Sequence, residues 1–228
     1  MTVIVEPSTT TPTPVFRGRA RWAAAALVTV GAALQVVEFV LEPPKDTTRA
    51  RLDWWLEHPH RRAGSQAAGL LAIPFLIGGF AVMVALTRRH SRRLAGVAAV
   101  ALTLAMTGLA AIHGFELAAR IAAEAGHTDA AATILDGDGV GIPGVVLFVM
   151  FLGGALVGTV SIYVAMWRSS YVPRLAVALG VSFVVLDLFV GMGRIGHLAA
   201  LGSGLVLAWA VVSGYARSPR PDRSRAAH

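Results

Sequence analysis

Six long runs of apolar residues constrain the fold of this chain more than any other feature of its sequence. Each is close to the roughly 20 residues that an α-helix needs to cross the hydrocarbon core of a bilayer. A single helix satisfies its own backbone hydrogen bonds there, so the runs predict an all-α bundle of six transmembrane helices. The runs cover about residues 22–41, 66–87, 94–117, 143–166, 175–192 and 196–215.

The composition agrees with a chain whose solvent is lipid. Of the 228 residues, 55% are hydrophobic and only 14% are charged, which is more apolar than a soluble domain needs for its core. The net charge of +7 comes from short basic clusters between the apolar runs. Nucleic-acid binding would need a continuous basic face, so the lipid bilayer is the predicted partner and nucleic acid is not. Cysteine is absent, which excludes disulfides and thiolate chemistry.

Basic residues predict the orientation, because cytoplasmic loops carry an excess of Arg and Lys. With six spans, 13 basic residues fall on the side of the termini and 7 on the other side. Both termini are therefore predicted to be cytoplasmic. Only the glycine-rich stretch at 191–196 separates the last two runs; if it were a kink within one helix, there would be five spans and the C-terminus would change sides.

The predicted organisation is one transmembrane domain, residues 21–216, between two disordered cytoplasmic tails, residues 1–20 and 217–228. The N-terminal tail is rich in Pro and Thr and has little hydrophobic mass, which is typical of disorder. The first apolar run is longer than the 7 to 15 apolar residues of a signal peptide, so it is predicted to be a retained anchor.

Two stretches between the apolar runs, and the spacing of two glycines, lead to further predictions. Trp54 and Trp55 lie beside charged residues, a composition typical of a segment at the membrane interface. Residues 136–141, DGDGVG, resemble the start of a calcium loop but lack its later acidic ligands, which favours a glycine-rich turn. The spacing of Gly154 and Gly158 allows close helix contact, either within the chain or between two copies of it.

Ionisable residues within or beside the apolar runs are the candidate functional residues. At 1.5 Å per residue, those inside the runs fall in the outer half of the membrane on several different helices. Intramembrane charge is costly, so a polar site shared by the first, third, fifth and sixth helices is predicted. Its candidate members are Glu38, His113, Glu116, Asp187, Arg194 and His197.

Ordinary structural roles remain open for several of these residues. Glu116 precedes Arg120 by four residues, the spacing of a helical ion pair. The side chain of Glu38 can reach the interface, and Arg194 falls in a predicted turn. Asp187 has no basic neighbour within one helical turn, so it needs a proton or a partner on another helix.

Three classes of function stay open. His113, Glu116 and His197 could ligate a divalent metal with nitrogen and oxygen donors, as in a metal-dependent intramembrane hydrolase. Titratable groups near neutral pH suit a small proton- or cation-coupled transporter. A scaffold without catalysis could use the same groups to join helices. Haem is not favoured, since two membrane histidines are the bare minimum for axial ligation.

Of the 20 basic residues, 19 are Arg, and Ala, Val and Gly are abundant, a skew typical of GC-rich bacterial genomes. In layout and composition the chain resembles uncharacterised six-helix integral membrane proteins of GC-rich actinobacteria. The resemblance implies a multi-pass protein of the bacterial inner membrane. It includes no specific motif and implies no activity.

Overall fold

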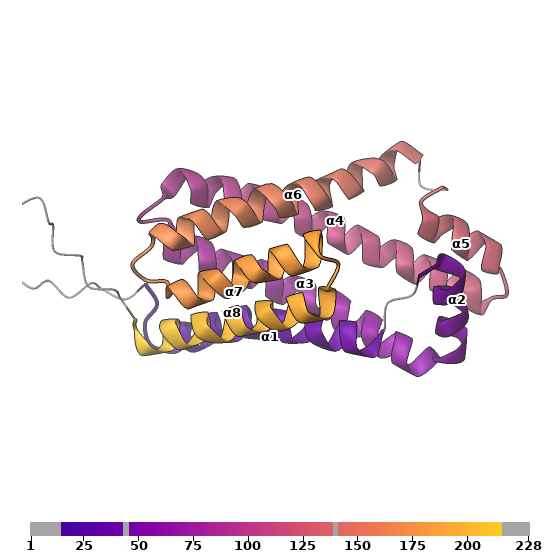
Figure 1. Ribbon diagram of the computed structural model, residues 1–228, viewed down its shortest axis with the longest axis horizontal. Helices are drawn as coiled ribbons and strands as arrows, with labels where there is room; N and C mark the ends of the chain where they lie inside the picture. The colour runs from indigo at the N-terminus through magenta and orange to yellow at the C-terminus, as the bar shows by residue number, and fades with distance from the viewer. Residues whose placement is uncertain (1–14, 43–45, 139–140, 216–228) are drawn as a thin grey trace, which may run out of the picture.

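The computed structural model describes residues 15–42, 46–138 and 141–215. These residues form eight α-helices and one π-helical turn, and most of the helices run along the long axis of the molecule (Figure 1). The predicted tail at 217–228, and most of the one at 1–20, lie outside the described residues.

Among the described residues, five helices are long and apolar enough to cross a membrane, which confirms the predicted class of an all-α, multi-pass membrane protein. Their outer faces expose large apolar side chains such as Val100, Val149 and Trp209, as expected for contact with lipid. Two of the helices continue well beyond the apolar runs that predicted them. The five are α1 (Arg19–Leu41), α3 (Pro59–Thr87), α4 (Arg92–Glu124), α6 (Gly141–Arg168) and α8 (Gly193–Ser213).

The predicted span at 175–192 differs from the other five. It forms helix α7 (Arg174–Val184), which continues into the π-helical turn η1 (Val185–Phe189). The 11 residues of α7 and the 5 of η1 together reach about 24 Å, less than the roughly 30 Å of a bilayer core. The chain then reverses at Gly191, whose φ is +70°. The described part of the chain thus contains five candidate spans, and the sixth predicted one is a short helix beside α8.

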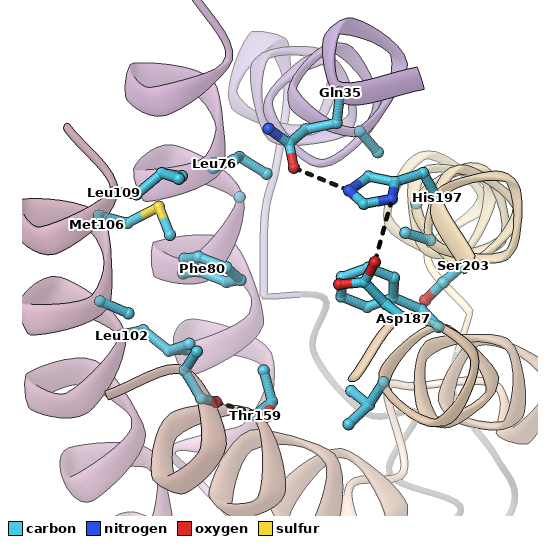
Figure 2. Close-up of a pocket in the computed structure, with 18 of the residues that line it drawn as sticks. Gln35, Leu76, Phe80, Leu102, Met106, Leu109, Thr159, Asp187, His197 and Ser203 are labelled. Carbon is cyan, nitrogen blue, oxygen red and sulfur yellow. Dashed lines mark hydrogen bonds and ion pairs between the residues drawn. The ribbon is translucent and has the colours of Figure 1, made fainter. Parts of the chain in front are cut away.

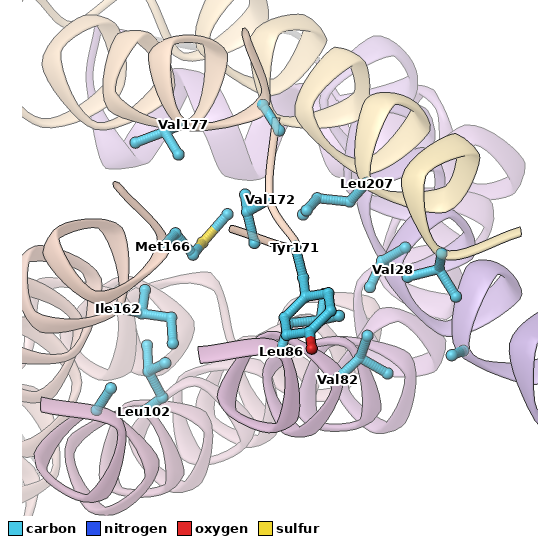
Figure 3. Close-up of a cluster of buried hydrophobic side chains, with 14 residues drawn as sticks. Val28, Val82, Leu86, Leu102, Ile162, Met166, Tyr171, Val172, Val177 and Leu207 are labelled. Carbon is cyan, nitrogen blue, oxygen red and sulfur yellow. The ribbon is translucent and has the colours of Figure 1, made fainter. Parts of the chain in front are cut away.

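The helices pack in two groups, α4 against α6, and α1 against α3 and α8, with α7 on α8. Side chains from both groups meet in one apolar core, which includes Val28, Leu102 and Leu207 (Figure 3). Gly154 and Gly158 are buried in the contact with α4. The predicted contact between two copies at these glycines is not available, because α4 of the same chain already occupies it.

The two ends of the bundle differ in chemistry. At one end, Arg21 donates to the carbonyl of Val212 over 3.4 Å, so α1 begins where α8 ends. The same end carries the exposed turn at residues 88–93 (Figure 1).

A cap covers the opposite end, formed by α2 (Thr48–Glu57), α5 (Thr128–Asp136) and the last turns of α4. Trp54 and Trp55 pack there with Ala119 and Ala123. The side chains of Trp54 and Trp55 are only 7% and 3% exposed, because α2 folds back onto the end of α4. That this segment lies at the membrane interface stays a prediction.

Candidate functional site

A cavity of about 350 Å³ lies between α1, α3, α4, α6, α7 and α8. Most of its wall is apolar and includes Phe80, Leu102 and Met106 (Figure 2). Polar side chains gather in one part of the wall. Five of the six candidate residues line this cavity, namely Glu38, His113, Glu116, Asp187 and His197. The sixth, Arg194, is exposed and does not line it.

His197 joins α8 to two other elements (Figure 2). Its Nε2 lies 3.2 Å from Oε1 of Gln35, and its Nδ1 lies 2.7 Å from the carbonyl of Gly193. Both ring nitrogens of His197 therefore lie within hydrogen-bonding distance of a neighbouring oxygen. The other end of the Gln35 amide donates to Oε2 of Glu38 over 3.1 Å.

Asp187 of η1 lies beside a histidine of α8. Its Oδ1 lies 3.8 Å from Nδ1 of His197. Two glycines make the approach possible. A Cβ on Gly193 would lie 3.0 Å from Oδ1 of Asp187, and one on Gly196 would lie 3.3 Å from its Cβ. The glycine-rich break therefore lets α8 begin directly against this carboxylate.

His113 lies between two carboxylates without a hydrogen bond to either. Its Nε2 is 3.8 Å from Oε1 of Glu38, and its Nδ1 is 3.6 Å from Oε2 of Glu116. The side chain is 5% exposed, and neither ring nitrogen has a hydrogen-bond partner among the described residues. Gly69 of α3 makes room for it, since a Cβ there would lie 2.6 Å from Cε1 of His113.

An ion cluster closes the end of the site that faces the cap. Glu116 accepts from Arg51 over 2.6 Å and from Arg62 over 3.1 Å. Glu42 pairs with the same two guanidinium groups and also accepts from the indole of Trp55 over 3.0 Å. The Arg62 side chain is 1% exposed, so this cluster is a buried part of the structure.

The predicted helical pair between Glu116 and Arg120 is wrong. Arg120 instead binds Glu124 over 2.7 Å and Gln66 over 3.2 Å. Glu116 turns toward α2 and α3, where two arginines can neutralise it away from water.

Sequence reasoning missed the partners of Glu116, because Arg51 and Arg62 counted only as loop charges. A signal was present in α3. Its polar and small residues Arg62, Ser65, Gln66 and Gly69 recur every three or four residues and are all buried. That spacing puts them on one helical face, which is the face that meets α1 and α4 at the site.

The candidate metal ligands do not form one centre. His197 is bound by Gln35 and Gly193, whereas His113 lies between Glu38 and Glu116. Across residues 15–42, 46–138 and 141–215, no three His, Cys, Asp or Glu side chains lie close enough together to hold a metal ion. The geometry gives the metal-dependent hydrolase hypothesis no support.

Acid should destabilise the cap through Glu42. Burial would raise the pKa of Glu42, but Arg51 and Arg62 outweigh it and hold the pKa below the ordinary value of 4.5. Such a group stabilises the fold at neutral pH, and this stabilisation is lost as the pH falls through the lowered pKa. We expect the melting temperature to fall on acidification below 4.5, and to fall less in Glu42→Gln. Thermal unfolding in detergent measures this; equal acid sensitivity in both proteins would contradict it.

No family model, curated protein or solved structure matches the chain. The class of the protein therefore rests on its own fold and site. It is a multi-pass α-helical membrane protein in which polar residues from several helices meet at an internal cavity.

Proposed function

We propose that the chain is a membrane binding protein for a small amphiphilic molecule, which it holds in the internal cavity. The single observation that carries the proposal is the cavity itself, about 350 Å³ in volume, with apolar walls and a polar cluster in one part. Small-molecule sites commonly have volumes of about 300–1,000 Å³ and a few polar groups that orient the ligand. The apolar part of the ligand would lie near Leu102 and Met106, and its polar group near Gln35 and His197.

The cost of the polar cluster supports a binding role over a purely structural one. Insertion of a charged side chain at the centre of a membrane helix costs about 2.5–3.5 kcal/mol. A hydrogen bond between membrane helices returns only about 0.6 kcal/mol on average. Glu38, Asp187 and the two histidines are thus an inefficient way to hold helices together. Their position on a cavity wall lets them contact a ligand, and this role explains their presence better than a contribution to stability does.

Octanol is a suitable first probe, because it has an apolar chain and a neutral polar head. A ligand at about 100 times its Kd stabilises a protein by about 2.7 kcal/mol, so octanol should raise the melting temperature of the detergent-solubilised protein by several degrees. Ala155→Phe, which fills the cavity from α6, should abolish the shift. Val160→Phe is the matched control, since Val160 lies on the exposed face of the same helix. Equal shifts in all three proteins would contradict the proposal.

We further propose that α7 and η1, which pack on α8, form a sixth, short crossing, and that residues 21–216 form one transmembrane domain in a bacterial cell membrane. The hydrogen bond between Arg21 and Val212 supports an even number of crossings, because it holds both ends of the domain together. The arginines at that end support its placement in the cytoplasm.

The orientation can be tested with single cysteines, since the chain has none of its own. His90 and His127 are both exposed. His90 lies in the turn between α3 and α4 and His127 in the turn between α4 and α5, and these two turns lie at opposite ends of the bundle (Figure 1). In intact cells, a membrane-impermeant maleimide should label His127→Cys and should reach His90→Cys only after permeabilisation. The reverse pattern would contradict the orientation.

Proton-coupled transport is a second candidate function, favoured by one specific observation. A continuous series of polar contacts runs along the cavity wall. It joins, in order, Asp187, His197, Gln35, Glu38 and His113. Histidine titrates near neutral pH, so protonation of these groups could be linked to ligand binding and release.

A further inference from the structure

With all four carboxylates ionised, the charges around the cavity balance only when both histidines are protonated. Four carboxylates and four bases make up the ion cluster and the polar series. The two guanidinium groups are always charged. With neutral imidazoles the assembly has two negative charges in excess, and with two imidazolium ions it has none. The carboxylates are Glu38, Glu42, Glu116 and Asp187, and the bases are Arg51, Arg62, His113 and His197.

The excess negative charge belongs to the cavity and not to the cap. Glu42 and Glu116 are each bound by both arginines. In the part of the chain that the structure describes, Glu38 and Asp187 each form an ion-pair contact only with a histidine, and both contacts are 3.8 Å long. Within the described residues, Glu38 accepts one side-chain hydrogen bond, from Gln35, and Asp187 accepts none.

His113 shows that the site has unused hydrogen-bonding capacity. It is nine-tenths buried, lines the cavity, and has no hydrogen-bond partner in the described chain for either ring nitrogen. The groups that face it come from three helices: Glu38 of α1, Arg62 of α3 and Glu116 of its own helix. A bound polar head would supply contacts that the protein itself does not make.

The surroundings of His197 favour a cation. It faces Gln35 of α1 and Asp187 of η1, and two aromatic rings flank it. Its ring centroid lies 4.0 Å from that of Phe39 and 5.2 Å from that of Phe183. Carboxylates and aromatic faces both attract a positive head, whereas an anion would be repelled by Asp187 and Glu38.

We propose that the ligand is an amphiphile with a single ammonium-type head, and that this head competes with the protons of His113 and His197 for the carboxylates Glu38 and Asp187. This inference rests on the proposed function and names its ligand class. Binding of the cation would release one proton to solvent and leave one of the two imidazoles neutral, so the site keeps its charge balance. Protonation of the imidazoles would in turn weaken cation binding.

The test compares three probes of equal chain length: octylammonium, octanol and octanoate. Their affinities for the full chain in detergent are measured by calorimetry at about pH 8 and about pH 5, since histidine titrates between these values. At the higher pH, octylammonium should bind at least about tenfold more tightly than octanol, a gap of about 1.4 kcal/mol. For each proton displaced, this advantage should fall by up to about tenfold per pH unit on acidification.

Three variants separate the contribution of the ammonium head to binding from that of the apolar chain. Glu38→Gln and Asp187→Asn should each lose the preference for octylammonium and still bind octanol. Glu124→Gln removes a carboxylate that pairs with Arg120 outside the cavity, and it should keep the preference.

Each other outcome overturns a different statement. If octanol or octanoate binds as tightly as octylammonium, the ammonium head is wrong and the proposed binding function stands. A preference for octylammonium that does not change with pH overturns the competition with protons. If none of the three probes binds, the proposed function itself is wrong.

Discussion

Replacement of Arg62 by methionine should lower the free energy of unfolding by about 3–5 kcal/mol, the usual effect of removing one partner from a buried ion pair. Arg62 is 1% exposed and binds both Glu42 and Glu116. Without it, two carboxylates at the base of the site would share Arg51 as their only guanidinium. Unfolding of the detergent-solubilised protein, followed by intrinsic tryptophan fluorescence, measures the loss.

A neighbouring residue and a second substitution control this experiment. Arg61→Met removes an exposed arginine that lies 5.7 Å from the ring centroid of Trp54, and it should cost less than about 1 kcal/mol. Glu116→Gln in the Arg62→Met background should recover part of the lost stability, because it removes one unpaired charge. Equal effects of the Arg61 and Arg62 substitutions would show that the ion cluster is not buried as described.

Gly154→Ala should destabilise the protein by about 1–3 kcal/mol, since it adds a methyl group to a filled contact. The new Cβ would lie 2.5 Å from the carbonyl oxygen of Ala101 and 2.7 Å from the amide nitrogen of Ala105. Both are backbone atoms of α4, so only a shift of the whole helix can relieve the clash. The shift would also move Met106 and Leu102 in the cavity wall. Thermal unfolding measures the effect.

Gly153 provides a matched control in the same helix. A Cβ there meets no atom within 4 Å, and alanine is favoured over glycine in a helix by up to about 1 kcal/mol. Gly153→Ala should therefore be neutral or slightly stabilising. If Gly154→Ala behaves like Gly153→Ala, the close contact between α4 and α6 is wrong.

The sequence predicts the long helices well, because the length and apolarity of a membrane span are properties of one segment. The sequence also predicts that five candidate residues lie in one region, since residues at the same depth on packed helices can meet. These are Glu38, His113, Glu116, Asp187 and His197. Five of the six candidate residues do line one cavity. Arg194 does not, because depth alone says nothing about the direction in which a side chain points.

The features that sequence reasoning missed depend on contacts between distant segments. Arg51 reaches Glu116 only because α2 folds back over the end of α4. The same fold buries Trp54 and Trp55. The shortness of α7 follows from the π-helical turn at Val185–Phe189 and the reversal at Gly191, neither of which changes the apolarity of the run. Gly69 matters through its closeness to His113. The spacing within α3 identifies the face on which Gly69 lies, but it does not identify the side chain that packs against it.

Diffraction from the full chain with a brominated octanol, labelled at the carbon farthest from the hydroxyl, tests the central claim most directly. The proposed function predicts anomalous bromine density in the apolar part of the cavity, among Leu102, Met106 and Thr159 (Figure 2). The density should be absent in Ala155→Phe. Bromine density confined to the lipid-facing surface of the helices, with none in the cavity, would contradict the claim that this cavity is a binding site.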